Sequence, residues 1–143
     1  MASFNKYETF VEHLAEKVHN LGSDTLKIML SNAAPNAATH TVRADSTELG
    51  AGNGYTSGGN AAAVSTSAQT SGVYKLVLSD PTAWTASGGT IGPFRYAILY
   101  NDTPSSPADP LIGWWDYGSS ITLQVGETFT VDLNGTNGVL TIT

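Results

Sequence analysis

The chain has 143 residues, which is the length of one domain and is enough to bury a core without staples. It contains no cysteine, so disulfides, thiolate metal sites and cysteine nucleophiles are excluded. Charged residues make up 13% of the chain, against roughly 25% in an ordinary globular domain. The net charge of −6 disfavours binding to nucleic-acid phosphates, whereas the hydrophobic content of 41% is too high for a disordered chain.

The first predicted element is a helix over Phe4–Leu21, within an N-terminal segment 1–22 that precedes a single β domain over 23–143. Its polar side carries an acidic ridge of Glu8, Glu12 and Glu16, interpreted either as a solvated face or as a docking surface for a basic partner. Gly22 is expected to end the helix. Apolar side chains recur at three- and four-residue steps at Tyr7, Phe10, Val11, Leu14, Val18 and Leu21.

Beyond residue 24 the pattern changes to short segments of alternating polarity separated by turn residues. Such closely spaced strands predict an antiparallel β-sandwich of jelly-roll type, with one N-terminal α-helix. The nearly continuous apolar run Phe94–Tyr100 indicates a central strand that is covered on both faces. The predicted strands are Thr25–Leu30, Ala63–Thr70, Val73–Ser79, Thr82–Trp84, Phe94–Tyr100, Leu111–Tyr117, Ser120–Gln124, Thr128–Leu133 and Val139–Thr143.

The segment of about 30 residues from Ser31 to Asn60 lacks any clear periodicity and is far longer than an ordinary loop. We expect it to be an extended, polar and glycine-rich arm that reaches away from the body. Its glycines at 50, 52 and 54 are not followed by the residues of a phosphate-binding loop, so they are better explained as flexible turn positions.

No catalytic motif is visible, and we expect neither an enzyme nor a bound cofactor or metal. Serines are frequent, but none lies in a G-x-S-x-G arrangement. His13 and His19 are six residues apart and would face different sides of the predicted helix, while His40 is expected to be solvated. A cation between the loop acids Asp102 and Asp109 stays an open alternative, as does a glycosidase pair of carboxylates.

The aromatic residues near position 115 are the clearest candidates for binding. Trp114 and Trp115 are adjacent in a predicted strand, so their rings are expected on opposite faces, and Tyr117 shares the face of Trp115. Exposed tryptophan and tyrosine rings stack on sugars or form subunit interfaces. A place in the core is the alternative for one of the two rings, as it is for Trp84.

Several segments together resemble small structural proteins that tailed bacteriophages and prophages encode, and the resemblance covers essentially the whole chain. It implies a virion protein, and proteins of this size and fold commonly serve as capsid decoration (cement) proteins. Tail, baseplate or fibre components are the nearest alternative. The segments that carry the resemblance are Leu21–Asn32, Gly54–Asn60, Trp84–Gly89, Gly92–Ala97, Leu111–Gly118, Gly126–Val131 and Gly138–Thr141.

The resemblance implies binding to the major capsid protein and self-association as a homo-dimer or homo-trimer. It implies no nucleic-acid or membrane partner, and the capsid surface as the location after synthesis in the host cytoplasm; neither a secretory signal nor a membrane-spanning run is expected. A carbohydrate-binding module that uses Trp114, Trp115 or Tyr117 is the alternative of another class. The expected partner-binding residues are Tyr7, Glu8, Glu12, Glu16, Arg43, Tyr55, Trp115 and Tyr117.

Overall fold

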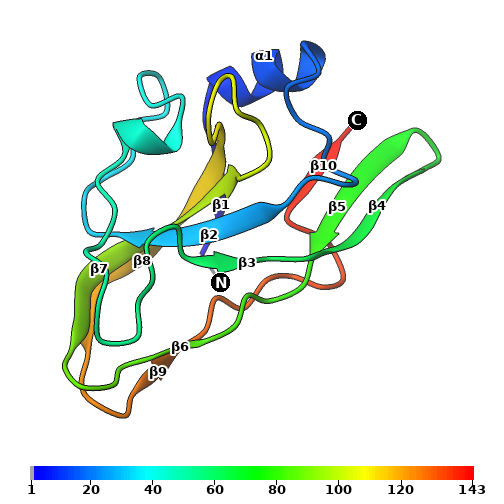
Figure 1. Ribbon diagram of the computed structural model, residues 1–143. Coiled ribbons are helices and arrows are strands. Elements are labelled where there is room, and N and C mark those ends of the chain that lie inside the picture. The colour runs from blue at the N-terminus through cyan, green and yellow to red at the C-terminus, as the bar shows by residue number, and fades with distance from the viewer. Residues whose placement is uncertain (1) are drawn as a thin grey trace.

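A computed structural model describes residues 2–143 and shows a mainly β protein with one α-helix (Figure 1). In chain order the elements are β1 (Phe4–Lys6), α1 (Thr9–Ala15), β2 (Leu26–Ser31), the 3₁₀-helix η1 (Arg43–Asp45), β3 (Asn60–Ala61), β4 (Val64–Thr70), β5 (Val73–Leu78), β6 (Trp84–Thr85), β7 (Ile91–Asn101), β8 (Leu111–Leu123), β9 (Thr128–Phe129) and β10 (Leu140–Ile142). The prediction of a mainly β fold is confirmed.

The strands form three antiparallel sheets. The largest has the order β1-β8-β7-β2-β3, the second has the order β10-β5-β4, and β6 pairs with β9. In Figure 1 the β4–β5 hairpin and β10 lie at the right, whereas β6 and β9 lie side by side along the lower edge. This sandwich-like arrangement is compatible with the expected jelly-roll connectivity, which stays a prediction.

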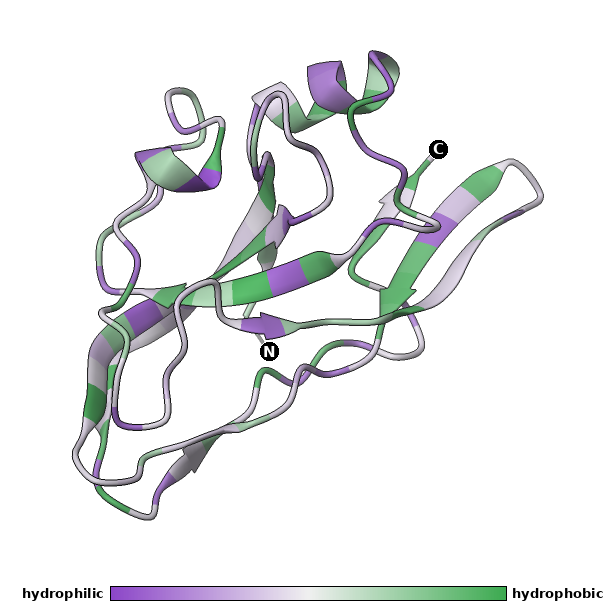
Figure 2. Cartoon of the chain, viewed as in Figure 1, coloured by the Kyte–Doolittle hydropathy of each residue, from purple (hydrophilic) through white to green (hydrophobic). Residues whose placement is uncertain are grey.

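The five-stranded sheet is covered on both faces. Leu99 of β7 belongs to the main core, whereas the neighbouring Ile98 packs in a second cluster with Tyr7 and Tyr100. Strand β2 alternates in the same way, with Ile28 and Leu30 in the main core and Met29 in the second cluster. Figure 2 shows that this strand is largely hydrophobic. Successive side chains of a strand point to opposite faces of its sheet, so the two apolar clusters lie on the two faces of this sheet. Each face must therefore be covered by other parts of the chain, as the apolar run Phe94–Tyr100 predicted.

The segment between β2 and β3 supplies part of the second cover. The backbone N–H of Arg43 donates to the carbonyl of Asp109 (2.9 Å), and that of Leu111 donates to the carbonyl of Thr41 (3.0 Å). The prediction of an arm that reaches away from the body is therefore wrong. The segment is an ordered loop that is hydrogen-bonded to the sheet, and we call it the 31–60 loop.

The N-terminal helix is much shorter than predicted. Phe4–Lys6 is strand β1, in which Phe4 lies opposite Trp115 of β8, and α1 ends at Ala15. After α1 the backbone of Lys17 has φ = 68°, and the N–H of Val18 donates to the carbonyl of His13 (2.8 Å). This left-handed termination is the Schellman motif, and it ends the helix before the predicted stop at Gly22.

The strained cap at Lys17 gives a stability prediction. Lys17→Gly is expected to raise the free energy of unfolding by about 1 kcal/mol, because glycine adopts positive φ without a Cβ clash. Urea unfolding measures the change. Lys17→Ala retains the Cβ atom and is expected to bring no gain. A Lys17→Gly protein that is less stable than wild type would show that the lysine contributes contacts that outweigh the strain.

Most other strands lie close to their predicted positions. The predicted segments Leu111–Tyr117 and Ser120–Gln124 are parts of one continuous strand, β8. The predicted strand Thr128–Leu133 is shorter, because only Thr128 and Phe129 pair with another strand. No helix among residues 2–143 has the length and apolar character needed to cross a membrane.

Candidate functional site

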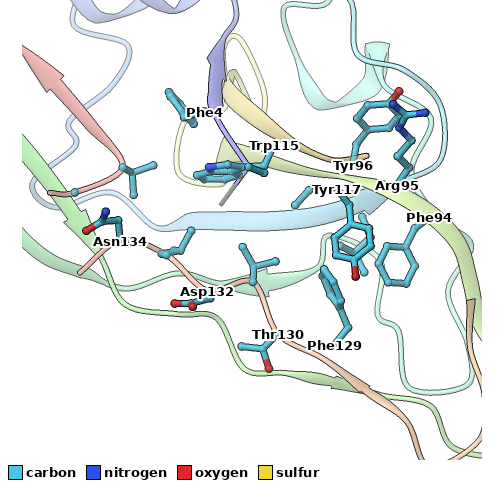
Figure 3. A pocket seen from close by; sticks show the side chains of 17 residues that line it. Phe4, Phe94, Arg95, Tyr96, Trp115, Tyr117, Phe129, Thr130, Asp132 and Asn134 are labelled. Carbon is cyan, nitrogen blue, oxygen red and sulfur yellow. The ribbon is translucent and has the colours of Figure 1, made fainter. Parts of the chain in front are cut away.

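A groove of about 560 Å³ lies between the β7–β8 side of the large sheet and the segment that follows β9 (Figure 3). Its volume lies within the range of roughly 300–1,000 Å³ that is typical of ligand sites. Most of its exposed lining is apolar. We call it the aromatic groove because five aromatic rings line it, those of Phe4, Phe94, Trp115, Tyr117 and Phe129. The ring of Tyr96 packs against the second apolar cluster, on the other face of the sheet.

Strand register brings the predicted residues Trp115 and Tyr117 into this groove together. They are two positions apart in β8, so both side chains point to the same face. Phe4 of β1 packs on Trp115 with ring centroids 5.1 Å apart. Trp114 points the other way and packs against buried Tyr7 at 4.7 Å. The predicted opposite orientation of the two tryptophans is confirmed, and both rings are half-buried.

A bulge in β8 presents Tyr117 at the mouth of the groove. Tyr96 pairs with Asp116 and Phe94 pairs with Ile121, so the four residues 117–120 of β8 lie opposite a single residue of β7. Bulges of this kind bend a strand and redirect a side chain. Tyr117 is 57% exposed as a result, and Figure 3 shows its ring pointing between Phe94 and the opposite wall.

The opposite wall begins with Phe129 of β9. Its ring lies edge-on to Phe94, with centroids 4.9 Å apart, and to Tyr117, with centroids 6.0 Å apart. The residues that follow bring polar groups to the lining, at Thr130, Asp132 and Asn134. The groove therefore combines aromatic surfaces with hydrogen-bonding groups along one side.

An ion pair fixes the guanidinium of Arg95 beside the Tyr96 ring, away from Tyr117 and Phe129 (Figure 3). Arg95 donates from Nε to Asp116 Oδ1 (2.7 Å) and from Nη2 to Asp116 Oδ2 (2.9 Å). The bonds from Arg95 and from the Gly118 N–H hold the pKa of Asp116 below its usual range. The guanidinium carbon lies 5.4 Å from the centroid of the Tyr96 ring. This two-point contact gives Arg95 a defined orientation.

Three of the residues expected to bind a partner are occupied inside the protein. Tyr7 is fully buried and Tyr55 is 3% exposed, so neither ring is available on the surface, and these two predictions are wrong. Arg43 binds Glu48 at 2.7 Å and Asp109 at 3.5 Å. It holds the 31–60 loop in place and is only partly exposed.

The acidic ridge of Glu8, Glu12 and Glu16 is exposed along α1, and none of the three residues lines the aromatic groove. Its role as a docking surface stays a prediction.

The histidines of the N-terminal segment come closer together than the predicted helix implied. Because the chain turns after Ala15, the rings of His13 and His19 lie 5.8 Å apart, edge to face. No group of three or more potential metal-binding side chains was found among residues 2–143. Of the two acids proposed for a cation site, Asp102 forms an ion pair with Lys27 at 2.8 Å, and Asp109 binds Arg43.

No protein-family model, no curated protein and no solved structure matches this chain. Its fold is that of an antiparallel β protein that carries an aromatic groove.

Proposed function

We propose that this chain is a structural protein of a bacteriophage virion, and specifically a capsid decoration protein that binds and stabilises the lattice of the major capsid protein. The sequence resemblance described above suggests this class. The structural observation that carries the proposal is the aromatic groove, which brings tryptophan and tyrosine together at one opening. Both residue types are enriched among those that dominate the binding energy of protein–protein interfaces.

The groove is organised in advance for a partner. Trp115 is held by Phe4, and Tyr117 is held at its edge by Phe129. Rings that are already fixed lose little conformational freedom when a partner binds. An apolar or aromatic side chain of the capsid protein would fill the groove, while Thr130, Asp132 and Asn134 would offer polar contacts along its wall.

Replacing Tyr117 tests this docking surface. Tyr117→Ala is expected to weaken binding to capsids stripped of this protein by about 30-fold, which corresponds to about 2 kcal/mol. Because the ring is 57% exposed, its removal is expected to leave the thermal unfolding midpoint nearly unchanged. Binding is measured by co-sedimentation with the capsids over a range of protein concentrations.

Val125→Ala is the matched control, because Val125 is 65% exposed and lies outside the groove. This variant is expected to bind as wild type does. If Tyr117→Ala binds the capsids with the same affinity as wild type, the groove is not part of the docking surface.

A carbohydrate-binding module is the second candidate, because Trp115 and Tyr117 share one groove with the polar residues Thr130, Asp132 and Asn134. Aromatic rings stack on sugars, and such polar groups bind sugar hydroxyls. If the groove binds a glycan, titration is expected to change the tryptophan fluorescence, and Trp115→Ala is expected to abolish the change. No binding on a glycan array, with unchanged fluorescence, would reject this candidate.

A further inference from the structure

One edge of the three-stranded sheet is not paired with any other strand among residues 2–143. Strand β4 is the outermost strand of the order β10-β5-β4. Among residues 2–143, the backbone hydrogen bonds outside regular strand pairing include none from residues 66–70. These residues pair only with β5, so their outward-facing backbone groups are free to bind another strand.

Natural proteins blunt the edges of their sheets with short strands, charged residues, proline or bulges. The other outermost strands of the two larger sheets are short: β1 and β10 have three residues each, and β3 has two. Strand β4 has seven residues and contains neither a charge nor a proline. Its register shift lies between Val64 and Thr66, which leaves a regular, uncharged edge from Thr66 to Thr70.

We propose that this edge pairs with the same edge of a second copy of the chain, antiparallel and about a two-fold axis. The sequence Thr66-Ser67-Ala68-Gln69-Thr70 is close to symmetric about its centre. Pairing centred on Ala68 would place Thr66 opposite the partner's Thr70 and Ser67 opposite the partner's Gln69. Cross-strand threonine pairs are favourable, and no like charges would face each other. The two three-stranded sheets would then form one sheet of six strands.

Charge favours this edge as the meeting point of two copies. Each chain carries a net charge of −6, so most approaches of one copy to another are repulsive. The side chains of Thr66, Ala68 and Thr70 are exposed and neutral. The charged side chain on the neighbouring strand that pairs with this stretch is Lys75, opposite Ala68. Five paired residues on each copy bury less surface than a standard protein–protein interface. The dissociation constant of the dimer is therefore expected to be micromolar or higher.

Sedimentation velocity of the purified protein, from micromolar to millimolar concentration, tests the proposal. Wild type is expected to show a reversible equilibrium between monomer and dimer. The double variant T66K/T70K places lysine opposite lysine twice and is expected to stay monomeric, and so is T66E/T70E. An equimolar mixture of the two variants is expected to recover the dimer, because opposite charges then face each other at both positions.

Thr141→Lys is the control, because Thr141 is exposed on β10 at the other edge of the same sheet. It is expected to dimerise as wild type does, and circular dichroism verifies that every variant is folded. A wild-type protein that is monomeric at millimolar concentration would overturn the proposal. So would dimerisation of T66K/T70K, or a mixture of the charged variants that does not associate. The test needs no capsid, so its result is independent of the proposed function.

Discussion

Replacing Glu48 by alanine is expected to lower the free energy of unfolding by about 3 kcal/mol and to detach part of the 31–60 loop from the sheet. The Glu48 side chain is 15% exposed. It accepts hydrogen bonds from Arg43 Nη2 (2.7 Å), from the Tyr55 hydroxyl (2.8 Å) and from the Gly58 N–H (2.5 Å). The Ser57 hydroxyl donates to the same carboxylate at 3.2 Å. Removal of the carboxylate deprives all four donors of this acceptor, and buried donors that lose their partner are costly.

The effect reaches the sheet through Tyr55. The hydroxyl of Tyr55, which is 3% exposed, accepts a bond from the N–H of Leu30 in β2 at 3.0 Å. Burial alone would raise the pKa of Glu48, but the bonds from Arg43, Gly58 and Tyr55 outweigh it and hold this pKa below its usual value. Glu48 is therefore ionised at neutral pH, and its charge orders both the loop and the Tyr55 ring.

Urea unfolding measures the loss of stability, and hydrogen exchange locates the loosened residues. Glu127→Ala is the control, because exposed Glu127 accepts one backbone bond, from the N–H of Gln124 at 2.7 Å. The control is expected to change stability by less than about 0.5 kcal/mol. A Glu48→Ala protein as stable as this control would contradict the structural role of the carboxylate.

Lowering the pH from 6.5 towards 4 is expected to reduce the free energy of unfolding by about 3 kcal/mol through His19 alone. Burial, together with the nearby His13, lowers the pKa of His19 to about 4, although Asp24 acts in the opposite direction. Below pH 6.5 the unfolded chain binds a proton at this residue that the folded chain does not bind. The contribution of His19 to the free energy of unfolding is therefore complete above pH 6.5. It falls by about 1.4 kcal/mol per pH unit below pH 6.5 and is lost below pH 4.

The contacts of His19 explain why its neutral form is preferred. The side-chain nitrogen Nδ2 of Asn101 lies 3.2 Å from His19 Nδ1. The same nitrogen donates a hydrogen bond to Asp24 Oδ2 at 2.7 Å. Asn101 Oδ1 accepts a bond from the Thr103 N–H (3.1 Å), which fixes the orientation of the amide. His19 Nδ1 is therefore an acceptor and holds no proton. Protonation at this nitrogen would place two donors against each other.

Urea unfolding at half-unit steps of pH measures this dependence. His19→Gln is expected to abolish most of the slope between pH 6.5 and 5, a range above the usual titration of carboxylates. His40→Gln, in the 31–60 loop, is expected to keep the slope of wild type. An unchanged slope in His19→Gln would mean that other groups titrate on unfolding in this range.

The strands could be predicted because alternation at period two is a local signal. The order β1-β8-β7-β2-β3 depends on pairings between distant segments, such as Phe4 with Trp115, and no local pattern indicates them. The same pairing explains the error at the N-terminus. Tyr7 and Phe10 are buried as an amphipathic helix requires, but Val11 of the predicted apolar stripe is 54% exposed. The helix predicted from the spacing of apolar residues was therefore too long at both ends, because α1 spans only Thr9–Ala15.

In the aromatic groove, too, only the features that depend on neighbouring residues could be predicted from the sequence. Trp115 and Tyr117 were predicted to share a face because they lie two residues apart in one strand. Phe4 and Phe129 come from opposite ends of the chain and join them only in the folded protein. The order of the 31–60 loop likewise depends on contacts such as that of Arg43 with Asp109, for which the sequence offers no local pattern.

Quantitative mass spectrometry of the purified virion that carries this gene tests the proposed role in the capsid. The number of copies is measured relative to the major capsid protein. A decoration protein is expected at a ratio near one to one, or at a simple fraction of that ratio. A handful of copies would contradict decoration and place the protein in the tail, and complete absence from the virion would contradict a structural role in it.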